Sequence, residues 1–161
     1  MELIKFADPV LHTQCQYFDF KTPPFDPLEF SQKLVGFMYE NNGIGLAANQ
    51  IGVPYSVFCM RAHPENFVCF NPKVVQFSNQ TIVLEEACLS YPRLLIKIKR
   101  PQHIRVRFNT PNGDTLTKQF TGLAARMFLH EMEHIQGKIF YSSANFYHKE
   151  QALKKWRKST R

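Results

Sequence analysis

The chain has 161 residues, 44% of them hydrophobic and 20% charged, and its formal net charge is +7. This length fits a single domain, and the apolar content excludes intrinsically disordered and fibrous classes. No apolar run approaches the ~20 residues of a membrane-spanning helix and no signal-peptide pattern opens the chain, so we expect a soluble cytoplasmic protein without a targeting segment.

An amphipathic helix is predicted to begin near Asp26. Asp26 can cap the helix, Pro27 suits its first position, and Glu29 follows three residues after the cap. Apolar side chains then recur at helical spacing as far as Met38. Asn-Asn-Gly at 41–43 supplies a stop, so we expect about four turns.

From Val53 to Phe120 the apolar pattern changes from helical spacing to alternation. The alternation is clearest in three runs, 53–59, 94–98 and 104–108. Charged side chains fill most positions between the apolar ones of the second and third runs, which predicts strands with one solvent-facing side. The turn Pro-Asn-Gly-Asp at 111–114 separates two such strands and is typical of a hairpin. We therefore expect antiparallel sheet in the middle of the protein.

A second helix is predicted from Leu123 to Gln136, because this segment contains neither proline nor glycine and Gly137 can end it. One face of this helix carries four side chains at positions i, i+4, i+7 and i+11: Leu123, Met127, His130 and His134. Two imidazoles therefore point in the same direction, one turn apart.

The C-terminal segment 148–161 carries most of the positive charge. Six lysines and arginines stand there against Glu150 alone, a balance of +5 that leaves +2 for the other residues. Ala152, Leu153 and Trp156 have the spacing of a short helical stripe. A solvated basic end accounts for this composition as well as a binding surface does. We expect a near-neutral body over 1–147 and a basic tail over 148–161.

Residues 130–134 read HEMEH, an HExxH sequence on the second predicted helix. His130 and His134 can bind one metal ion, while Glu131 lies about 100° around the helix and can handle the proton of an activated water. HExxH also occurs by chance, and two histidines on a partly apolar face can be packed core residues. A catalytic metal needs a third protein ligand.

No further ligand follows in the helix, so the third must come from another segment. Cys88, in Glu-Glu-Ala-Cys-Leu-Ser at 85–90, offers a soft thiolate donor. The alternative is a small buried hydrophobe, which is the usual place of a free cysteine.

A third segment, Gly-Ile-Gly-Leu-Ala-Ala-Asn-Gln at 43–50, follows the first helix. Its glycines and alanines form a surface that a substrate backbone can approach closely, and Gln50 offers amide donors. By itself the segment is equally compatible with a tight turn and small-residue packing, and it lacks the spacing of nucleotide-binding fingerprints.

Taken together and in this order, the three segments resemble the peptide deformylase family. The motifs of that family are G-φ-G-φ-A-A-x-Q, E-G-C-φ-S and H-E-x-x-H (φ apolar), and here they read GIGLAANQ, EACLS and HEMEH. Three motifs in order are far more specific than any one of them. The resemblance covers roughly residues 1–145, with 1–147 as the deformylase-like catalytic domain.

The resemblance implies a role for individual residues. It makes Cys88, His130 and His134 the ligands of one divalent metal ion, Fe²⁺ in the cell with Ni²⁺, Co²⁺ or Zn²⁺ as substitutes. Glu131 becomes the general acid/base, and the Gln50 side chain and the Leu89 backbone N–H become stabilisers of the oxyanion. The expected substrate-binding surface contains six residues: Gly43, Ile44, Gly45, Ala87, Leu123 and Met127. Arg126 is expected at the mouth of the pocket for the methionine side chain.

The implied fold is α+β, with mainly antiparallel sheet packed around a central metal-binding HExxH helix and an N-terminal amphipathic helix. The implied activity is metal-dependent hydrolysis of the N-formyl group from the initiator methionine of nascent polypeptides, which releases formate. We expect a monomer in the cytoplasm of a bacterial cell or a phage-infected host, with N-formylmethionyl peptides as substrates and no membrane partner. The resemblance also suggests a contact between the basic tail and the ribosome.

Three positions depart from the family pattern. Ala87 replaces the glycine before the cysteine, Leu129 stands where glutamine usually precedes the His-Glu pair, and Glu133 stands where aspartate is usual. If that glycine has an unusual φ, Ala87 would disturb substrate contacts. None of the three removes a ligand, so we expect activity to be retained.

Two other functions compete with this interpretation. An HExxH peptidase would use the same metal and base on internal peptide bonds, but such an enzyme normally completes its site with His, Glu or Asp. An RNA-binding module with a structural metal is the second alternative; structural zinc sites have four protein ligands, whereas three candidates are in view.

Overall fold

Antiparallel strands form the middle of the fold, which the computed structural model describes for residues 1–159. Residues 160 and 161, the end of the expected basic tail, lie outside the described residues. One sheet has the order β1 (Gly45–Ala47), β2 (Val57–Ala62), β3 (Glu65–Phe77), β6 (His103–Asn109) and β7 (Thr115–Thr121). The other pairs β4 (Thr81–Cys88) with β5 (Tyr91–Pro101). The expected α+β class with mainly antiparallel sheet is confirmed.

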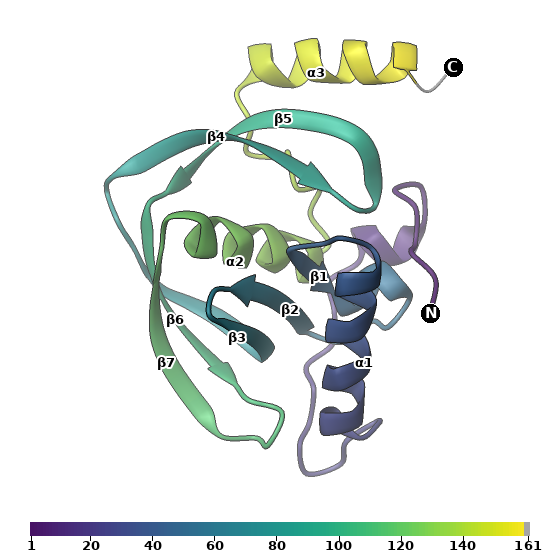
Figure 1. Ribbon diagram of the computed structural model, residues 1–161, viewed down its shortest axis with the longest axis vertical. Coiled ribbons are helices and arrows are strands. Elements are labelled where there is room, and N and C mark those ends of the chain that lie inside the picture. Colours follow the sequence, from purple (N-terminus) through teal and green to yellow (C-terminus); the bar gives the residue numbers. More distant parts are fainter. Residues whose placement is uncertain (160–161) are drawn as a thin grey trace.

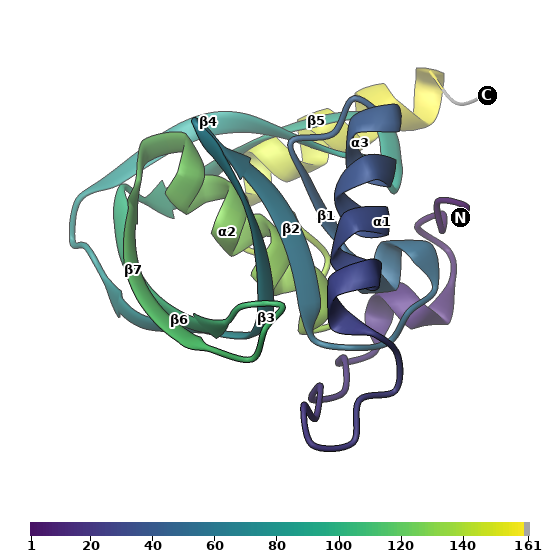
Figure 2. The ribbon, with the colours of Figure 1, turned by 60° about the horizontal axis from the view of Figure 1, so that its bottom comes forward.

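Helix α2 (Gly122–Ile135) lies between the two sheets (Figure 1). The five-stranded sheet curves around it, and β6 and β7 are farthest along the curve (Figure 2). The β4–β5 hairpin covers the opposite side of α2, and α3 (Phe146–Ser159) lies on the outside of that hairpin (Figure 1). The segment that contains the HExxH sequence is thus enclosed by sheet on two sides.

Helix α1 (Pro27–Glu40) packs beside β1 and β2. Its start is fixed by the Asp26 carboxylate, which accepts a hydrogen bond from the Glu29 N–H at 2.8 Å. Asn42, in the left-handed region at φ 54°, turns the chain after the helix toward β1. Two short 3-10 helices, Pro9–His12 and Ala48–Ile51, complete the helical segments of residues 1–159.

The strand alternation read from the sequence holds in β5 and β6, where every second side chain is buried. The hairpin turn at 111–114 also lies where expected, between β6 and β7, with Gly113 at φ +88°. The expected strand over 53–59 was wrong in its first half, because β2 begins only at Val57. Pro54 has no N–H to donate to a neighbouring strand, and Tyr55 pairs with Gln16 in an isolated bridge rather than within the sheet.

The core consists of three apolar clusters, each between two layers. One fills the space between α2 and the five-stranded sheet, around Phe58 and Phe128. The second lies under α1, around Phe18 and Phe70, and the third joins β5 to Phe140 and α3. Among residues 1–159, no helix combines the length and the apolar character that crossing a bilayer requires.

Candidate metal centre

Helix α2 supplies two histidines to the space under the β4–β5 hairpin. His130 and His134 are one turn apart, their ring centroids lie 5.1 Å from each other, and both are buried. Asn49 fixes the end of this helix, because its Nδ2 donates to the His134 carbonyl at 2.7 Å. Burial lowers the pKa of His134 well below its usual value, which keeps that ring neutral and available as a ligand.

Cys88 is the last residue of β4, where a register irregularity between Glu86 and Cys88 breaks the pairing with β5. Its Sγ lies 3.1 Å from His134 Nε2. One ligand atom from each of Cys88, His130 and His134 lies within 4.8 Å of the other two. Segments separated by more than 40 residues therefore bring a thiol and two imidazoles together in a buried cluster.

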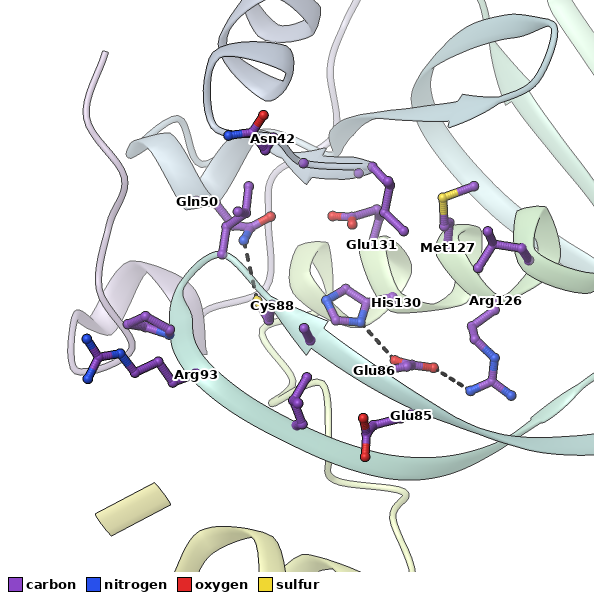
Figure 3. A pocket seen from close by; sticks show the side chains of 18 residues that line it. Asn42, Gln50, Glu85, Glu86, Cys88, Arg93, Arg126, Met127, His130 and Glu131 are labelled. Carbon is purple, nitrogen blue, oxygen red and sulfur yellow. Dashed lines mark hydrogen bonds and ion pairs between the residues drawn. The ribbon is translucent and has the colours of Figure 1, made fainter. Parts of the chain in front are cut away.

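Glu86 holds His130 in place from behind. Its Oε2 lies 2.9 Å from His130 Nδ1, which leaves Nε2 as the atom that can serve as a ligand. Figure 3 shows Glu86 between His130 and Arg126. Burial alone would raise the pKa of Glu86, but hydrogen bonds from Arg100 and His130 outweigh it and lower the pKa to about 2. Glu86 is therefore ionised at neutral pH.

Two buried arginines complete this network. Arg100 donates to Glu86 through Nε at 2.6 Å and to Glu133 through Nη2 at 2.9 Å. Arg126 donates to Glu86 at 2.7 Å and to the carbonyls of Ile98 and Ile82 at 2.9 and 2.7 Å. Arg126 does line the cavity, but its guanidinium is buried and occupied by these acceptors. The expectation that it stands at the pocket mouth was wrong.

Glu131 also points into the site, from the neighbouring position on α2 (Figure 3). It is buried, and its Oε2 has no hydrogen-bond partner within residues 1–159. Burial raises the pKa of this carboxyl to about 7. Strand β1 passes close by: a Cβ added at Gly45 would overlap the Glu131 carboxylate, so glycine at this position leaves room for the acid. A carboxyl group of this kind can take up and release a proton near neutral pH.

Gln50 faces the cluster from the opposite side. Its Oε1 accepts the Ala47 N–H at 2.9 Å, which orients the amide so that Nε2 points to Ser90 Oγ at 3.1 Å and Cys88 Sγ at 3.6 Å. The side chain is buried. The Gln50 amide therefore places an N–H donor beside the Cys88 thiol, and neither of its other partners, Ala47 N–H and Ser90 Oγ, is charged.

A cavity of about 510 Å³ opens onto these groups. Eleven of the twelve residues expected at the site line it: Gly43, Ile44, Gly45, Gln50, Ala87, Cys88, Leu89, Leu123, Met127, His130 and Glu131. His134 lies behind this surface, in contact with Cys88. Ala87 does not belong to the non-glycine residues with left-handed φ, which are Asn42, Asn71 and Arg93 in the described part of the chain. The alanine therefore imposes no backbone strain there.

No role was predicted for Glu86 or Arg100 from the sequence. One signal could have found them. Arg100 continues the alternation of Leu94, Ile96 and Ile98 in β5, so it falls on the buried face of the strand. An arginine at an inward position requires a buried anionic partner. Glu86, on the adjacent strand of the same hairpin, is that partner.

The donor set fits a metal ion. One thiolate and two imidazoles suit Fe²⁺, Co²⁺, Ni²⁺ or Zn²⁺, and three protein ligands leave a coordination position open. The carboxylate behind His130 is the outer partner that metal-binding histidines commonly have. The unpartnered carboxyl oxygen of Glu131 faces the same space.

The chain is similar to known proteins in both sequence and fold. The sequence model of the polypeptide deformylase family matches residues 1–150. A peptide deformylase of Thermotoga petrophila is 34% identical over 136 residues, which cover 82% of this chain and 79% of that protein. The crystal structure of peptide deformylase from Thermotoga maritima superposes with a TM-score of 0.83 at 29% identity, covering 89% of this chain and 97% of the other. A Synechococcus elongatus peptide deformylase in complex with actinonin gives 0.87 at 28% identity, covering 98% and 86%.

Proposed function

Because the chain belongs to the peptide deformylase family, we propose that it hydrolyses the N-formyl group of the initiator methionine on nascent polypeptides. The products are formate and a free α-amine. The observation that carries the proposal is the convergence of Cys88, His130 and His134 with Glu131 and Gln50 on one cavity.

In this proposal Cys88, His130 and His134 hold one divalent ion, Fe²⁺ in the cell, with Ni²⁺, Co²⁺ or Zn²⁺ able to replace it. When bound, the ion supplies Lewis-acid activation of water and of the formyl carbonyl. The mutual distances of the three ligand atoms support this assignment, as does the Glu86 carboxylate that orients His130. The metal identity rests on the family resemblance.

Glu131 takes the proton of the attacking water and returns it to the departing amine. A general acid/base works best with a pKa near the operating pH, and burial raises the pKa of Glu131 to about 7. The partnerless Oε2 is available to accept that proton. Proton transfer of this kind typically accelerates the reaction by about 10²–10⁴-fold.

Gln50 Nε2 and the Leu89 backbone N–H stabilise the negative charge that develops on the formyl oxygen. The Ala47 N–H orients the Gln50 amide before the reaction begins, so little reorganisation is needed. Loss of one such donor typically costs about 3–4 kcal/mol in the transition state.

The methionine side chain occupies the apolar part of the cavity formed by Ile44, Leu123 and Met127. Ile44 and Leu123 are 48% and 57% exposed and Met127 is buried, so they form an open wall with a closed floor. The backbone of the substrate passes along Gly43, Gly45 and Ala87. Gly43 lets the chain pass close to Leu89, because a Cβ at this position would come within 2.9 Å of Leu89 Cδ1.

The test is formate release from formyl-Met-Ala by the metal-loaded enzyme, measured against an unblocked Met-Ala-Ser peptide. We expect formate in amounts equal to the new α-amine and no cleavage of the unblocked peptide. Cleavage of internal peptide bonds in both substrates would favour the peptidase alternative instead.

We further propose that 1–147 is the catalytic domain, that the enzyme is a cytoplasmic monomer, and that tail 148–161 contacts ribosomal RNA. Within the described residues, α3 buries Leu153, and the Trp156 indole donates to the Pro92 carbonyl at 2.8 Å. Lys154, Lys155 and Lys158 are exposed. Replacing these three lysines by glutamine should reduce co-sedimentation with ribosomes at low salt and leave formate release unchanged. Unchanged co-sedimentation would contradict the role of the tail.

A further inference from the structure

Two hollows lie outside the catalytic cavity, on the side of the molecule formed by β3, β5, β6 and β7. The larger, of about 580 Å³, lies between β3, the end of β5 and the C-terminal half of α2. The smaller, of about 250 Å³, lies between β3, β6 and β7. Phe77 lines both, with 55% of its surface exposed, and neither hollow shares a lining residue with the catalytic cavity.

Basic side chains surround these hollows. Lys73, Lys99 and Lys138 line the larger one and Arg105 lines the smaller one. Arg107 is the cross-strand partner of Lys73 and lies two residues from Arg105 on β6. All five are exposed. We call these cations, together with Phe77, the basic face: Lys73, Phe77, Lys99, Arg105, Arg107 and Lys138.

The positive charges of the basic face are not balanced within the protein. In the part of the chain that the structure describes, no carboxylate forms an ion pair with any of the five cations. Glu133 lines the larger hollow, but it is bound to the buried Arg100 at 2.9 Å. Lys73 directly opposite Arg107 places like charges together, which destabilises a sheet. A bound polyanion would relieve this repulsion.

Phe77 indicates which kind of polyanion fits. Phe77 ends β3 opposite the buried Ile104, so its exposed ring lies at the edge of the sheet, between the two hollows, where a nucleic-acid base can stack. Gln119 and His103, in the smaller hollow beside it, carry amide and imidazole groups that can bind the edges of a base. Arg105 and Arg107 are roughly 7 Å apart along β6, close to the step between phosphates of an extended strand.

We propose that the basic face binds single-stranded RNA, with a base stacked on Phe77 and phosphates on the surrounding lysines and arginines. An acidic protein could use the same cations but would gain little from the exposed ring and its polar neighbours. The net charge of the body is only +2, so this surface arises from the folded arrangement of the charges. It is separate from the exposed lysines of α3.

The experiment measures binding of a labelled oligouridine of about 12 nucleotides to the full-length, metal-loaded enzyme by fluorescence anisotropy at several salt concentrations. Replacing Arg105 and Arg107 by glutamine removes two phosphate contacts. The slope of log K against log salt should then become shallower by about 1.4. Phe77→Leu should weaken binding about tenfold without changing the slope, because it removes stacking and no charge.

The matched control replaces Lys21 and Lys33, two exposed lysines away from this face, by glutamine. It changes the net charge equally, and both the affinity and the slope should stay close to those of the parent. Formate release, measured on every variant, should stay at the parent value because none of these side chains lines the catalytic cavity. Thermal unfolding of each variant checks that it is folded.

Three outcomes would overturn the proposal. The arginine pair and the lysine control could give the same affinity and slope, which would mean that binding follows net charge alone. Oligoglutamate of equal charge could compete as well as RNA while Phe77→Leu has no effect, which would identify an acidic protein as the partner. Glutamine at Lys154, Lys155 and Lys158 could abolish binding while the basic-face variants retain it, which would assign the RNA to α3.

Discussion

Replacing Glu86 by glutamine perturbs the buried group that holds the candidate site together. In the parent, this carboxylate receives hydrogen bonds from Arg100 and Arg126 and is paired with His130 Nδ1. Glutamine has nearly the same shape but no charge, and its NH₂ group would face a cationic donor. Arg100 keeps Glu133 and Arg126 keeps two backbone carbonyls, so the variant should still fold.

The expected loss in the free energy of unfolding follows from the burial of Glu86. Removing one partner of a buried ion pair costs about 3–5 kcal/mol. The pKa of Glu86 gives a second value for this loss. Its lowering from the ordinary 4.5 to about 2 corresponds to about 3 kcal/mol of folding free energy. For a chain of this size, a loss of about 3–5 kcal/mol corresponds to a Tm lower by roughly 6–20 °C.

The assay is calorimetric unfolding of metal-free parent and variant, with Glu29→Gln as control. Glu29 pairs with Lys33, but both side chains are about 60% exposed, so that substitution should cost less than about 1 kcal/mol.

The folded pKa of Glu86 lies below its unfolded value. Its contribution is therefore present above about pH 4.5 and is lost as the pH falls toward 2, so the Tm difference should shrink over that range. A Tm difference under about 2 °C at pH 7 would refute the reasoning.

Four further substitutions test individual roles. Glu131→Gln should retain the metal, as measured by elemental analysis, and lower kcat by at least ~10² because proton transfer is lost; retained turnover would contradict the role. Cys88→Ala should lose both metal and activity, and tight metal binding by this variant would place the third ligand elsewhere. Gly45→Ala should displace the Glu131 carboxylate and lower kcat by up to ~10² at unchanged metal content; parent-like kcat would show that Glu131 adjusts freely. Ala87→Gly should alter KM modestly and leave the metal content unchanged, since a methyl group is no donor; loss of metal would reveal a positioning role.

The sequence predicted those parts of the fold that depend on local patterns. Alternating apolar residues located β5 and β6, and Asn112-Gly113 located the turn between β6 and β7, because these signals need only short-range sterics. Strand β1 was not predicted. Its three residues, Gly45–Ala47, are extended because they pair with β2, and glycine and alanine carry no strand preference of their own.

The sequence predicted the site residues that belong to a motif. It did not predict those whose position depends on contacts between distant segments. Spacing on one helix placed His130 beside His134, but nothing local shows that Arg126 is buried against Glu86 from another layer. The tail was similar. Its composition left a solvated end and a binding surface equally open, and only the spacing of Ala152, Leu153 and Trp156 indicated an apolar stripe. Leu153 is buried against the β5 side of the molecule within residues 1–159. Such contacts depend on segments that meet only after folding.

The central proposal for this protein is a metal-dependent deformylation at Cys88, His130 and His134. One measurement tests it: metal content by mass spectrometry together with formate release from formyl-Met-Ala, on protein purified without oxygen. We expect one divalent ion per chain, with formate and a free methionine amine in equal amounts, and loss of both signals after chelation. Protein that binds no metal when supplied with Fe²⁺, Ni²⁺ or Zn²⁺ and releases no formate would contradict the account.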